Sequence, residues 1–531
     1  MLLLLLSSLA SGADASCATA ESTAAFNKGF AAQQAMKTDE ALQAYLTCLE
    51  LDPDCVSCNY EVGWTYWSRS EWGKTIAAWE KTLTLDPNHN AAATWLTSAK
   101  DAAGGGSASA VYATGLRVPL GIKSKQQGPL HLELTGRFQN YNAHPADKND
   151  IWDNEIYSPK SARFLSDGSK VYVNSLEGFT TGVFDPHDIK RLGIIRHEFG
   201  PEEAGLFKDE TSVFGYPYNR RPASGEVNQF KGKPVESTLS HKDRYLWTPY
   251  YRRDYDYGAT SPSAVAIIDT QTDQIVRIMP TGPVPKYVVP SPDNHWLAVT
   301  HWGDNTLGVI DISSQNPDDF KYLPERLVVE KILDQTGLMG TDRDATCGYC
   351  LRGTAFTNDS KTLLVARMGS GGIAGFDVDS WEYLGTVTGE KATPRHLVVS
   401  KDSKTLFLSS SRSGHVSRIS LDHVLSTLRS ANGQSVPIEG WKSVYVGGGA
   451  RTIELSPDER YIYTAVNSKS ELVAVDAENM TVAARLRSDS FTVGLAVSPD
   501  GKQVWTTSQG RNHRGGNSVC VYTVTIDENP E

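Results

Sequence analysis

The stretch Arg451-Thr-Ile-Glu-Leu-Ser-Pro-Asp-Glu-Arg-Tyr-Ile-Tyr-Thr-Ala-Val-Asn467, followed by Leu472-Val-Ala-Val-Asp476, decides the fold. It contains an apolar strand, a Ser-Pro-Asp turn, a second strand, a polar loop and a third strand that ends in aspartate. Alternating apolar residues bounded by such turns are typical of antiparallel β-strands. The stretch therefore predicts a three-stranded meander, and its turn aspartate, Asp458, marks the position from which copies can be aligned.

Seven copies of this unit lie between Ser158 and the C-terminus, and a fourth strand follows most of them. The last unit ends before its fourth strand, whereas an unassigned strand, His131–Phe138, precedes the first. One strand missing at one end and one spare at the other predict a closed ring, which leaves no exposed sheet edge. The turn aspartates are Asp167, Asp243, Asp293, Asp359, Asp402, Asp458 and Asp500.

The repeated unit resembles the YVTN/YncE-like seven-bladed β-propellers from Ser158 onward, most strongly in units three to seven. Unit two departs from the pattern, and Gly200–Gly232 is predicted there as an inserted loop. The resemblance implies a mainly β fold, with a seven-bladed β-propeller over residues 131–531. Relatives in that family include binding and surface proteins, and similar propellers serve as lactonases and redox-enzyme subunits, so the resemblance implies a fold more firmly than a function.

A second period, of 34 residues, occupies the N-terminal part of the chain, and each copy closes on Leu-Asp-Pro. Two helices per copy, with a small residue where they cross, resemble the tetratricopeptide repeat. The resemblance implies a small N-terminal α-helical TPR domain over residues 16–103, capped by a helix at 90–102, with a groove that holds a peptide. The matched positions are Gly29 with Gly63 and Tyr45 with Trp79.

Residues 1–15 are predicted to be a secretory signal peptide, because five leucines are followed by small residues and an Ala13-Asp14-Ala15 cleavage pattern. Cys17 leaves a lipoprotein anchor as the lesser alternative. Residues 104–130 begin with a Gly/Ser/Ala-rich run and are predicted to be a linker. No other apolar run approaches the roughly 20 residues that a membrane-spanning helix needs. We therefore expect an exported protein, periplasmic or extracellular, without a transmembrane segment.

The composition narrows the classes of partner. The 531 residues include 51 basic and 62 acidic side chains, a net charge of −11. Such a chain repels nucleic acid and anionic lipid as a whole, so any anion-binding site has to be local. With 40% hydrophobic and 21% charged residues, the chain is neither disordered throughout nor a multi-span membrane protein.

The seven cysteines favour disulfides in an exported protein, with metal and redox sites as lesser alternatives. Cys347 and Cys350 are predicted to form a small disulfide beside the propeller channel. In the helical part, Cys48 is predicted to pair with Cys55 or Cys58, because a Cys55–Cys58 bond would stay within one helical turn. Cys520 is the residue expected to stay unpaired.

Five of the seven propeller units carry a cation seven residues before the turn aspartate. This position begins the innermost strand of a blade, so the cations should surround one mouth of the central channel. Glu236 takes the position in unit two and Val493 in unit seven. The five cations are Lys160, Lys286, Arg352, Arg395 and Arg451.

Loops between the second and third strands return to the same face, and together with the inner strands they add histidines and a further arginine. We expect the combined set to bind an anionic small ligand or an acidic protein segment. The alternatives are cations that are solvated or paired with carboxylates such as Glu236, Asp304, Asp342 and Asp344, and a metal held by converging histidines. The added residues are His301, His396, His415, Arg511 and His513.

Motifs for catalysis are missing from the sequence: it has no Gly-x-Ser-x-Gly elbow, no His-Glu-x-x-His and no phosphate-binding loop. We therefore predict no catalytic residue, no cofactor and no metal. The segment Tyr250–Tyr257 is predicted to be an exposed recognition loop for a carbohydrate or peptide, or else a packed lid. The expected function is an exported binding or scaffold protein in which TPR helices and the propeller face engage protein or anionic ligands. The alternative is an enzyme, either a lactonase-like hydrolase or a metal-dependent oxidoreductase.

Overall fold

The computed structural model describes most of the chain in two compact units, 1–114 and 115–531, and each is considered by itself. The predicted signal peptide lies outside the described residues. Those residues are 16–34, 37–68, 71–89, 91–93, 95–96, 99, 118–125, 128–208, 210, 212–217, 229–256, 259–333, 342–510 and 517–527.

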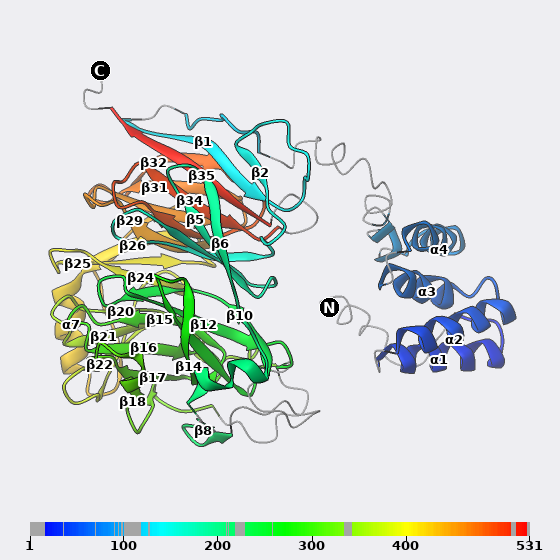
Figure 1. Ribbon diagram of the computed structural model, residues 1–531, viewed down its shortest axis with the longest axis horizontal. Coiled ribbons are helices and arrows are strands. Elements are labelled where there is room, and N and C mark those ends of the chain that lie inside the picture. Colours follow the sequence, from blue (N-terminus) through cyan, green and yellow to red (C-terminus); the bar gives the residue numbers. More distant parts are fainter. Residues whose placement is uncertain are drawn as a thin grey trace. The chain divides into compact units, whose positions relative to one another are not determined.

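The N-terminal unit consists of helical hairpins (blue in Figure 1): α1 (Ala20–Gln34), α2 (Thr38–Leu51), α3 (Val56–Ser68) and α4 (Trp72–Leu85). Helix α4 repeats α2 at an interval of 34 residues. A Cβ atom on Gly29 would lie 2.6 Å from the Tyr45 ring, and one on Gly63 would lie 2.3 Å from the Trp79 ring. The predicted period is therefore also a packing repeat. Most of the capping helix expected at 90–102 falls outside the described residues.

Two disulfides join these hairpins, and three of their four cysteines are buried. Cys48 pairs with Cys58, one of its two expected partners, and Cys55 pairs with Cys17, a partner that the sequence analysis did not foresee. In the second unit, Cys347 pairs with Cys350 as predicted. Cys520 is a free buried thiol, and burial raises its pKa to about 12.

The described part of the second unit is mainly β and forms the seven-bladed propeller that the repeat count predicts, so the fold class is confirmed (Figure 1). The first blade contains β3 (Pro159–Phe164), β4 (Val171–Ser175), β5 (Thr180–Asp185) and β6 (Lys190–Arg196). The second contains β11 (Thr238–Ser240), β12 (Tyr245–Arg253), β13 (Pro262–Asp269) and β14 (Gln274–Pro283), extended by β10 (Phe230–Pro234) and β7 (Glu198–Phe199). The third contains β15 (Pro285–Pro290), β16 (Trp296–His301), β17 (Thr306–Asp311), β18 (Lys321–Tyr322) and β19 (Leu327–Val328).

The later blades keep the same order. The fourth contains β20 (Leu351–Phe356), β21 (Thr362–Arg367), β22 (Ile373–Asp377), β23 (Tyr383–Thr388) and β27 (Ser435–Pro437). The fifth contains β24 (Pro394–Val399), β25 (Thr405–Ser410), β26 (His415–Ser420) and β28 (Lys442–Tyr445), and the sixth β29 (Ala450–Leu455), β30 (Tyr461–Val466), β31 (Glu471–Asp476) and β32 (Thr481–Arg487). The seventh contains β33 (Thr492–Val497), β34 (Gln503–Ser508), β35 (Ser518–Ile526), β1 (Leu130–Gln139) and β2 (Asp150–Trp152).

Smaller elements connect or flank the blades. The region expected as an insertion in unit two contains the 3-10 helix η1 (Pro201–Phe207) and the strand pair β8 (Ser212–Val213) and β9 (Tyr216–Pro217). Another 3-10 helix, η2 (Pro317–Asp319), precedes β18. The helix α7 (Leu421–Ser430) follows β26 in the fifth blade. None of the described helices combines the length and apolarity that crossing a bilayer requires.

The ring closes between its two ends. Strand β1 pairs antiparallel with β35, from Leu130 opposite Ile526 to Gln139 opposite Ser518, so the N-terminal strand completes the last blade as expected. Within the span predicted as a linker, residues 118–125 run beside β1, where the Gly121 N–H donates to the carbonyl of Leu134.

The repeated turn explains why each first and second strand form a hairpin. Ser456 Oγ donates to Asp458 at 2.6 Å and accepts from the N–H of Tyr461 at 3.0 Å. The turns at Ser291, Ser400 and Ser498 make the same two hydrogen bonds. Serine and aspartate two residues apart therefore fix the turn through their own side chains.

The segment Tyr250–Tyr257 is not the exposed loop that was one of its two expected forms. Residues 250–253 belong to β12, and Tyr250 is fully buried. Arg253 and Asp256 are both buried and form an ion pair at 2.9 Å. The described part of this segment is therefore packed against the blade.

Candidate functional site

The predicted cations occupy one structural position. Each is the second residue of the first strand of its blade, and these first strands contact one another around the ring. Glu236 lies just before β11, and Val493 is the second residue of β33. The cations are Lys160 in β3, Lys286 in β15, Arg352 in β20, Arg395 in β24 and Arg451 in β29.

Glycines after the cation position allow neighbouring first strands to approach closely. A Cβ atom on Gly353 would lie 2.4 Å from the carbonyl oxygen of Arg395, and one on Gly494 would lie 2.4 Å from that of Lys160. No heavier residue fits at either place without moving backbone. The backbone that carries the cations is therefore set by close contacts between blades.

Four of the cations form a group that we call the cation cluster: Lys160, Arg352, Arg395 and Arg451. Their charges act on one another, and burial followed by Arg451 and Arg352 lowers the pKa of Lys160 well below its ordinary value. Burial and then Arg352 and Arg451 also lower the pKa of Arg395. Burial opposes ionisation of Glu236, but Arg352 and Lys160 outweigh it and lower the pKa of this carboxyl.

Two members of the cation cluster, Lys160 and Arg395, lack a carboxylate partner among the described residues. Arg352 Nη2 lies 2.7 Å from Glu236 Oε1, and both side chains are largely buried. Among the described residues, neither Lys160 nor Arg395 has a carboxylate within 4.0 Å. Arg395 is only 5% exposed, yet its Nη2 has no hydrogen-bond partner, and its Nη1 contacts Met368 Sδ at 3.5 Å. Arg395 therefore holds one buried donor, Nη2, that the described protein does not satisfy.

Lys286 lies beside the cation cluster, but its charge is paired. Its Nζ is 2.8 Å from Asp344 Oδ1 and lies 3.8 Å from the centre of the Tyr251 ring and 5.0 Å from that of Trp302. Burial lowers the pKa of Lys286 to about 7 despite the opposing effect of Asp344. Asp344 is one of the carboxylates that were expected as alternative partners of these cations. The aromatic pair around Lys286 could not be foreseen, because neither ring occupies an aligned repeat position.

The predicted histidines are not brought together. His301 is fully buried in the third blade, where its Nε2 accepts from the N–H of Gly282 at 3.1 Å and its Nδ1 donates to Thr306 Oγ1 at 2.9 Å. Burial lowers the pKa of His301 to about 3. His415 packs against Tyr445, with ring centres 5.4 Å apart.

Of the predicted histidines, His396 is the one whose charge acts on Glu236 beside the cation cluster. Its Nδ1 accepts from the N–H of Ile453 at 3.3 Å, which leaves Nε2 to donate to Tyr287 Oη at 2.7 Å. Burial lowers the pKa of His396 to about 4, so the ring is neutral at physiological pH. Arg511 and His513 lie outside the described residues.

One group of metal-type ligands lies close enough to hold a single ion in the part of the chain that the structure describes. It consists of Cys17, Cys48, Cys55 and Cys58 in the helical unit. These four residues form the two disulfides described above, so they have no thiolate with which to bind a metal ion.

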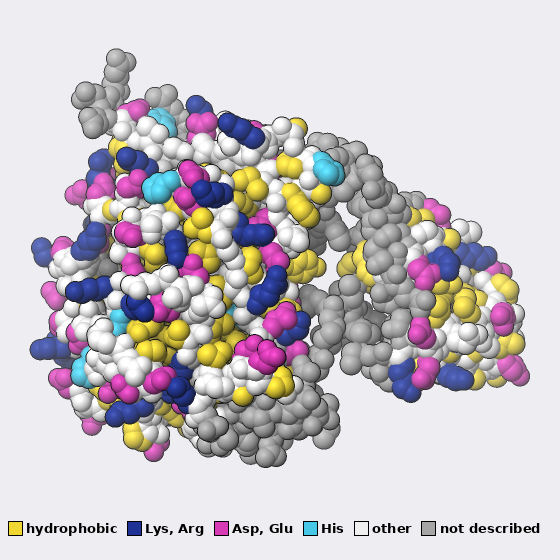
Figure 2. Space-filling view, in the orientation of Figure 1, with side chains coloured by type: hydrophobic (Ala, Val, Ile, Leu, Met, Phe, Trp, Pro, Cys, Tyr) yellow, Lys and Arg dark blue, Asp and Glu magenta, His cyan; other side chains and the backbone are white. Residues whose placement is uncertain are grey.

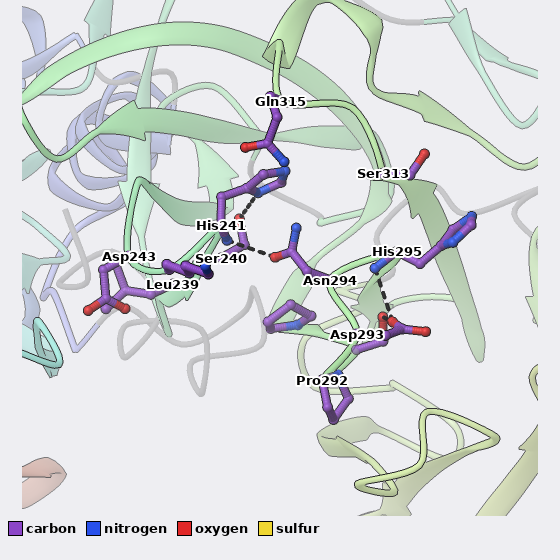
Figure 3. A pocket seen from close by; sticks show the side chains of 13 residues that line it. Leu239, Ser240, His241, Asp243, Pro292, Asp293, Asn294, His295, Ser313 and Gln315 are labelled. Atoms are coloured by element: carbon purple, nitrogen blue, oxygen red, sulfur yellow. Dashed lines mark hydrogen bonds between the residues drawn. The ribbon is translucent and has the colours of Figure 1, made fainter.

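A cavity of about 630 Å³ lies at the opposite end of the second and third blades, between the turns that follow β11 and β15 (Figure 3). Its buried histidine, His241, donates from Nε2 to the carbonyl of Ser314 and accepts at Nδ1 from Ser240 Oγ, each at 2.9 Å. The backbone N–H of His241 donates to Asn294 Oδ1 at 2.7 Å. His241 therefore has partners for both ring nitrogens, in contrast to Arg395 Nη2, and no residue predicted for the site lines this cavity.

The fold and the site define a seven-bladed β-propeller with a cluster of cations on its innermost strands. No family model matches the chain, and no curated protein matches it. Among solved structures it is similar to the β-propeller domain of Myceliophteria thermophila Cps50 (Swd1), at 12% identity and a TM-score of 0.47, covering 70% of this chain and 97% of that one. It is also similar to Kuenenia stuttgartiensis hydrazine synthase, at 14% identity and a TM-score of 0.48, covering 73% of this chain and 99% of that one.

Proposed function

We propose that the propeller is a binding module that holds an anionic ligand at the mouth of its central channel. The observation that carries this proposal is Arg395 of the cation cluster, which is buried, has no carboxylate within 4.0 Å among the described residues, and has no hydrogen-bond partner for its Nη2. A buried charge without a partner is costly, and an anion would supply the missing partner. The face visible in Figure 2 has basic and acidic side chains interspersed and shows no large basic patch.

Binding can be tested by thermal unfolding of the full chain in the presence of sulfate, with chloride at matched ionic strength as reference. An anion that binds the folded state raises the midpoint by mass action. We expect the apparent affinity for sulfate, obtained from the shift in the midpoint, to fall at least tenfold in Arg395→Met. This change removes a buried guanidinium that has no carboxylate partner among the described residues. Arg460→Gln is the matched control, since this exposed arginine lies at the turn end of the sixth blade. Equal sulfate effects in the wild type and both variants would refute the site.

The metal content of the purified protein distinguishes the binding module from the alternative of a metal-dependent oxidoreductase. A metal-dependent oxidoreductase would contain stoichiometric copper or iron, which elemental analysis would detect. Such a result would favour the alternative over a binding module.

We also propose that the chain is an exported protein whose helical unit is of the tetratricopeptide type. Three disulfides support export, because such bonds persist in oxidising compartments. The 34-residue packing repeat supports the repeat type. A YVTN/YncE-like origin of the blades is supported by their repeated Ser-x-Asp turns.

A peptide partner of the helical unit would meet the half-exposed rings of an aromatic cluster on α3, which also pack against Trp79 and Trp95. Tyr60, Trp64 and Trp67 are half-buried and share one face of this helix, with ring centres 6.3 Å and 5.9 Å apart along it. We expect a partner captured by the full chain from an envelope fraction to be lost with Trp64→Ala and kept with the propeller variant Trp381→Ala. Equal capture by both variants would exclude this surface.

A further inference from the structure

Four cysteine side chains of the helical unit converge from three segments of the chain. The first segment precedes α1, the second is the last turn of α2, and the third is the start of α3. Three of the four side chains are fully buried, and the group packs against Ala25, Phe26 and Leu49. A bond or a metal ion within the group therefore joins both helical hairpins. We call it the cysteine cluster: Cys17 before α1, Cys48 in α2, and Cys55 and Cys58 at the start of α3.

The sulfur atoms of the cysteine cluster have the spacing of a tetrahedral thiolate site. Cys17 Sγ lies 3.8 Å from Cys48 Sγ and 3.9 Å from Cys58 Sγ, although neither pair is bonded. All four sulfur atoms lie within 4.8 Å of one another. Zinc–sulfur bonds of about 2.3 Å in a tetrahedron place neighbouring sulfurs about 3.8 Å apart. The cluster is therefore close to the geometry that four thiolates adopt around one Zn²⁺ ion.

The start of α3 adds features that favour thiolates. Cys55 and Cys58 have the Cys-x-x-Cys spacing that zinc sites commonly use. The N–H of Cys58 donates to Cys55 Sγ at 3.4 Å, and such a bond strengthens when the sulfur carries a negative charge. The positive end of the helix dipole at the same place also stabilises a thiolate. Reduction of the cluster would therefore leave sulfur ligands that are already oriented toward one point.

We infer that the cysteine cluster, once its disulfides are reduced, binds one Zn²⁺ ion through four thiolates. Zinc is the ion that these ligands select, because soft thiolates in a tetrahedral arrangement suit it and disfavour Mg²⁺ and Ca²⁺. Four protein ligands leave no open position for water, so the site is structural and takes over the role of the disulfides in joining the hairpins. This inference does not depend on the anion site of the propeller.

The two forms of the cluster are related by a redox step followed by metal binding. Two molecules of a dithiol reductant supply four electrons and four protons and become disulfides, while the two disulfides of the cluster become four thiols. Zinc binding then releases up to four protons to solvent, because the ligands are thiolates. The zinc-bound cluster carries a net charge of about −2, since four thiolates face one divalent ion.

Zinc binding is tested on the full chain before and after reduction. Under exclusion of oxygen, a water-soluble phosphine reduces the disulfides; it takes its oxygen from water and supplies no competing thiol. The protein is then mixed with zinc chloride, desalted over a weak chelator and subjected to elemental analysis. We expect about one zinc ion in each reduced chain and less than about 0.1 in each oxidised chain. Co²⁺ in place of Zn²⁺ should give the intense visible absorption of a tetrahedral tetrathiolate site.

Cysteine variants show where the metal is bound. The affinity of Cys58→Ser for zinc should fall by about tenfold or more, with loss of the cobalt absorption, because one ligand is removed. The double variant Cys347→Ser/Cys350→Ser lacks the propeller disulfide and is the control that should keep both properties. If Cys58→Ser does not fold, Cys17→Ser provides the same test at the one member of the cluster that is not fully buried.

Circular dichroism distinguishes a site in the folded unit from binding by an unfolded chain. The reduced, zinc-loaded protein should keep the helical content of the oxidised protein. The inference would be overturned by reduced wild type that binds no zinc, by cluster variants that bind zinc as tightly as the wild type, or by zinc bound only with loss of helix.

Discussion

At the scale of one residue, Arg395 lowers the stability of the folded propeller. Its guanidinium is 5% exposed and is opposed by Arg352 and Arg451. Two unit charges about 8 Å apart repel by about 2 kcal/mol at an effective dielectric of 20. Such a side chain lowers the stability of the empty propeller. The cost is offset when an anion occupies the site, which links binding directly to stability.

Gly353 holds this arrangement in place, and its replacement should disturb both stability and binding. In Gly353→Ala the new methyl group would meet the carbonyl oxygen of Arg395 and the Cα of His396, and both are backbone atoms. Strands β20 and β24 would have to separate, at a cost of about 1–3 kcal/mol. We expect the free energy of unfolding in urea to fall by that amount and sulfate binding to weaken.

Gly193→Ala is the control, because a Cβ atom on Gly193 meets nothing within 4 Å. Its stability should stay within about 0.5 kcal/mol of the wild type. If Gly353→Ala behaved like Gly193→Ala, close packing of the first strands would not be what positions the cations.

At the scale of the element, one buried side chain of β1 reinforces the closure of the ring. Arg137 is 2% exposed and binds Asp150 through Nε at 3.0 Å, Asp489 at 3.1 Å and the carbonyl of Val118 at 2.9 Å. Asp489 lies in the connection between the sixth and seventh blades. Arg137 therefore ties the N-terminal strand to the C-terminal blade with charge as well as with strand pairing.

Arg137→Met should weaken closure strongly, because it leaves two buried carboxylates without their cation. Loss of one member of a buried ion pair costs about 3–5 kcal/mol. Urea denaturation gives the measurement, and Arg485→Met gives the control. Arg485 pairs with Glu471 at 2.7 Å on the exposed surface, where such a pair contributes about 1 kcal/mol or less. Similar losses in the two variants would contradict the role assigned to Arg137.

The elements could be predicted from the sequence better than the site because the elements are specified locally. Ser456 and Asp458 form their turn with atoms two to five residues apart, so a repeated pattern reveals every blade that contains it. The charge state of the site depends on distant partners instead. Lys286 is paired with Asp344, 58 residues further on, in a long connection that belongs to no repeat. Cys17 likewise pairs with Cys55, 38 residues away, and the 34-residue repeat does not predict this pairing.

At the scale of the whole molecule, buried neutral histidines make the stability depend on pH. Burial lowers the pKa of His197 and His301 to about 3 and that of His396 to about 4. The unfolded chain takes up protons on these groups below its pKa of about 6.5, whereas the folded protein does not until the pH nears 4 or 3. Their contribution is therefore complete above pH 6.5 and is lost as the pH falls toward 4.

We expect each such histidine to add a slope of up to about 1.4 kcal/mol per pH unit to the free energy of unfolding between pH 4.5 and 6. Urea denaturation across this range should show a shallower slope in His301→Gln than in the wild type. The slope of the free energy of unfolding against pH reports the protonation of His301 even if the variant is less stable than the wild type at every pH. The exposed His423, changed to Gln, is the control, and an unchanged slope in both variants would refute the prediction.

Pairing of β1 with β35 also sets the order of events during synthesis. His131 meets Asp527 across 396 residues, so the first strand of the propeller leaves the ribosome long before its partner exists. At about 5–20 residues per second the interval is about 20–80 s. Throughout it, both edges of the growing array stay unpaired and open to wrong partners. The ring can close only after translation is almost complete. The first propeller strand to be synthesised is therefore the last to reach its final place.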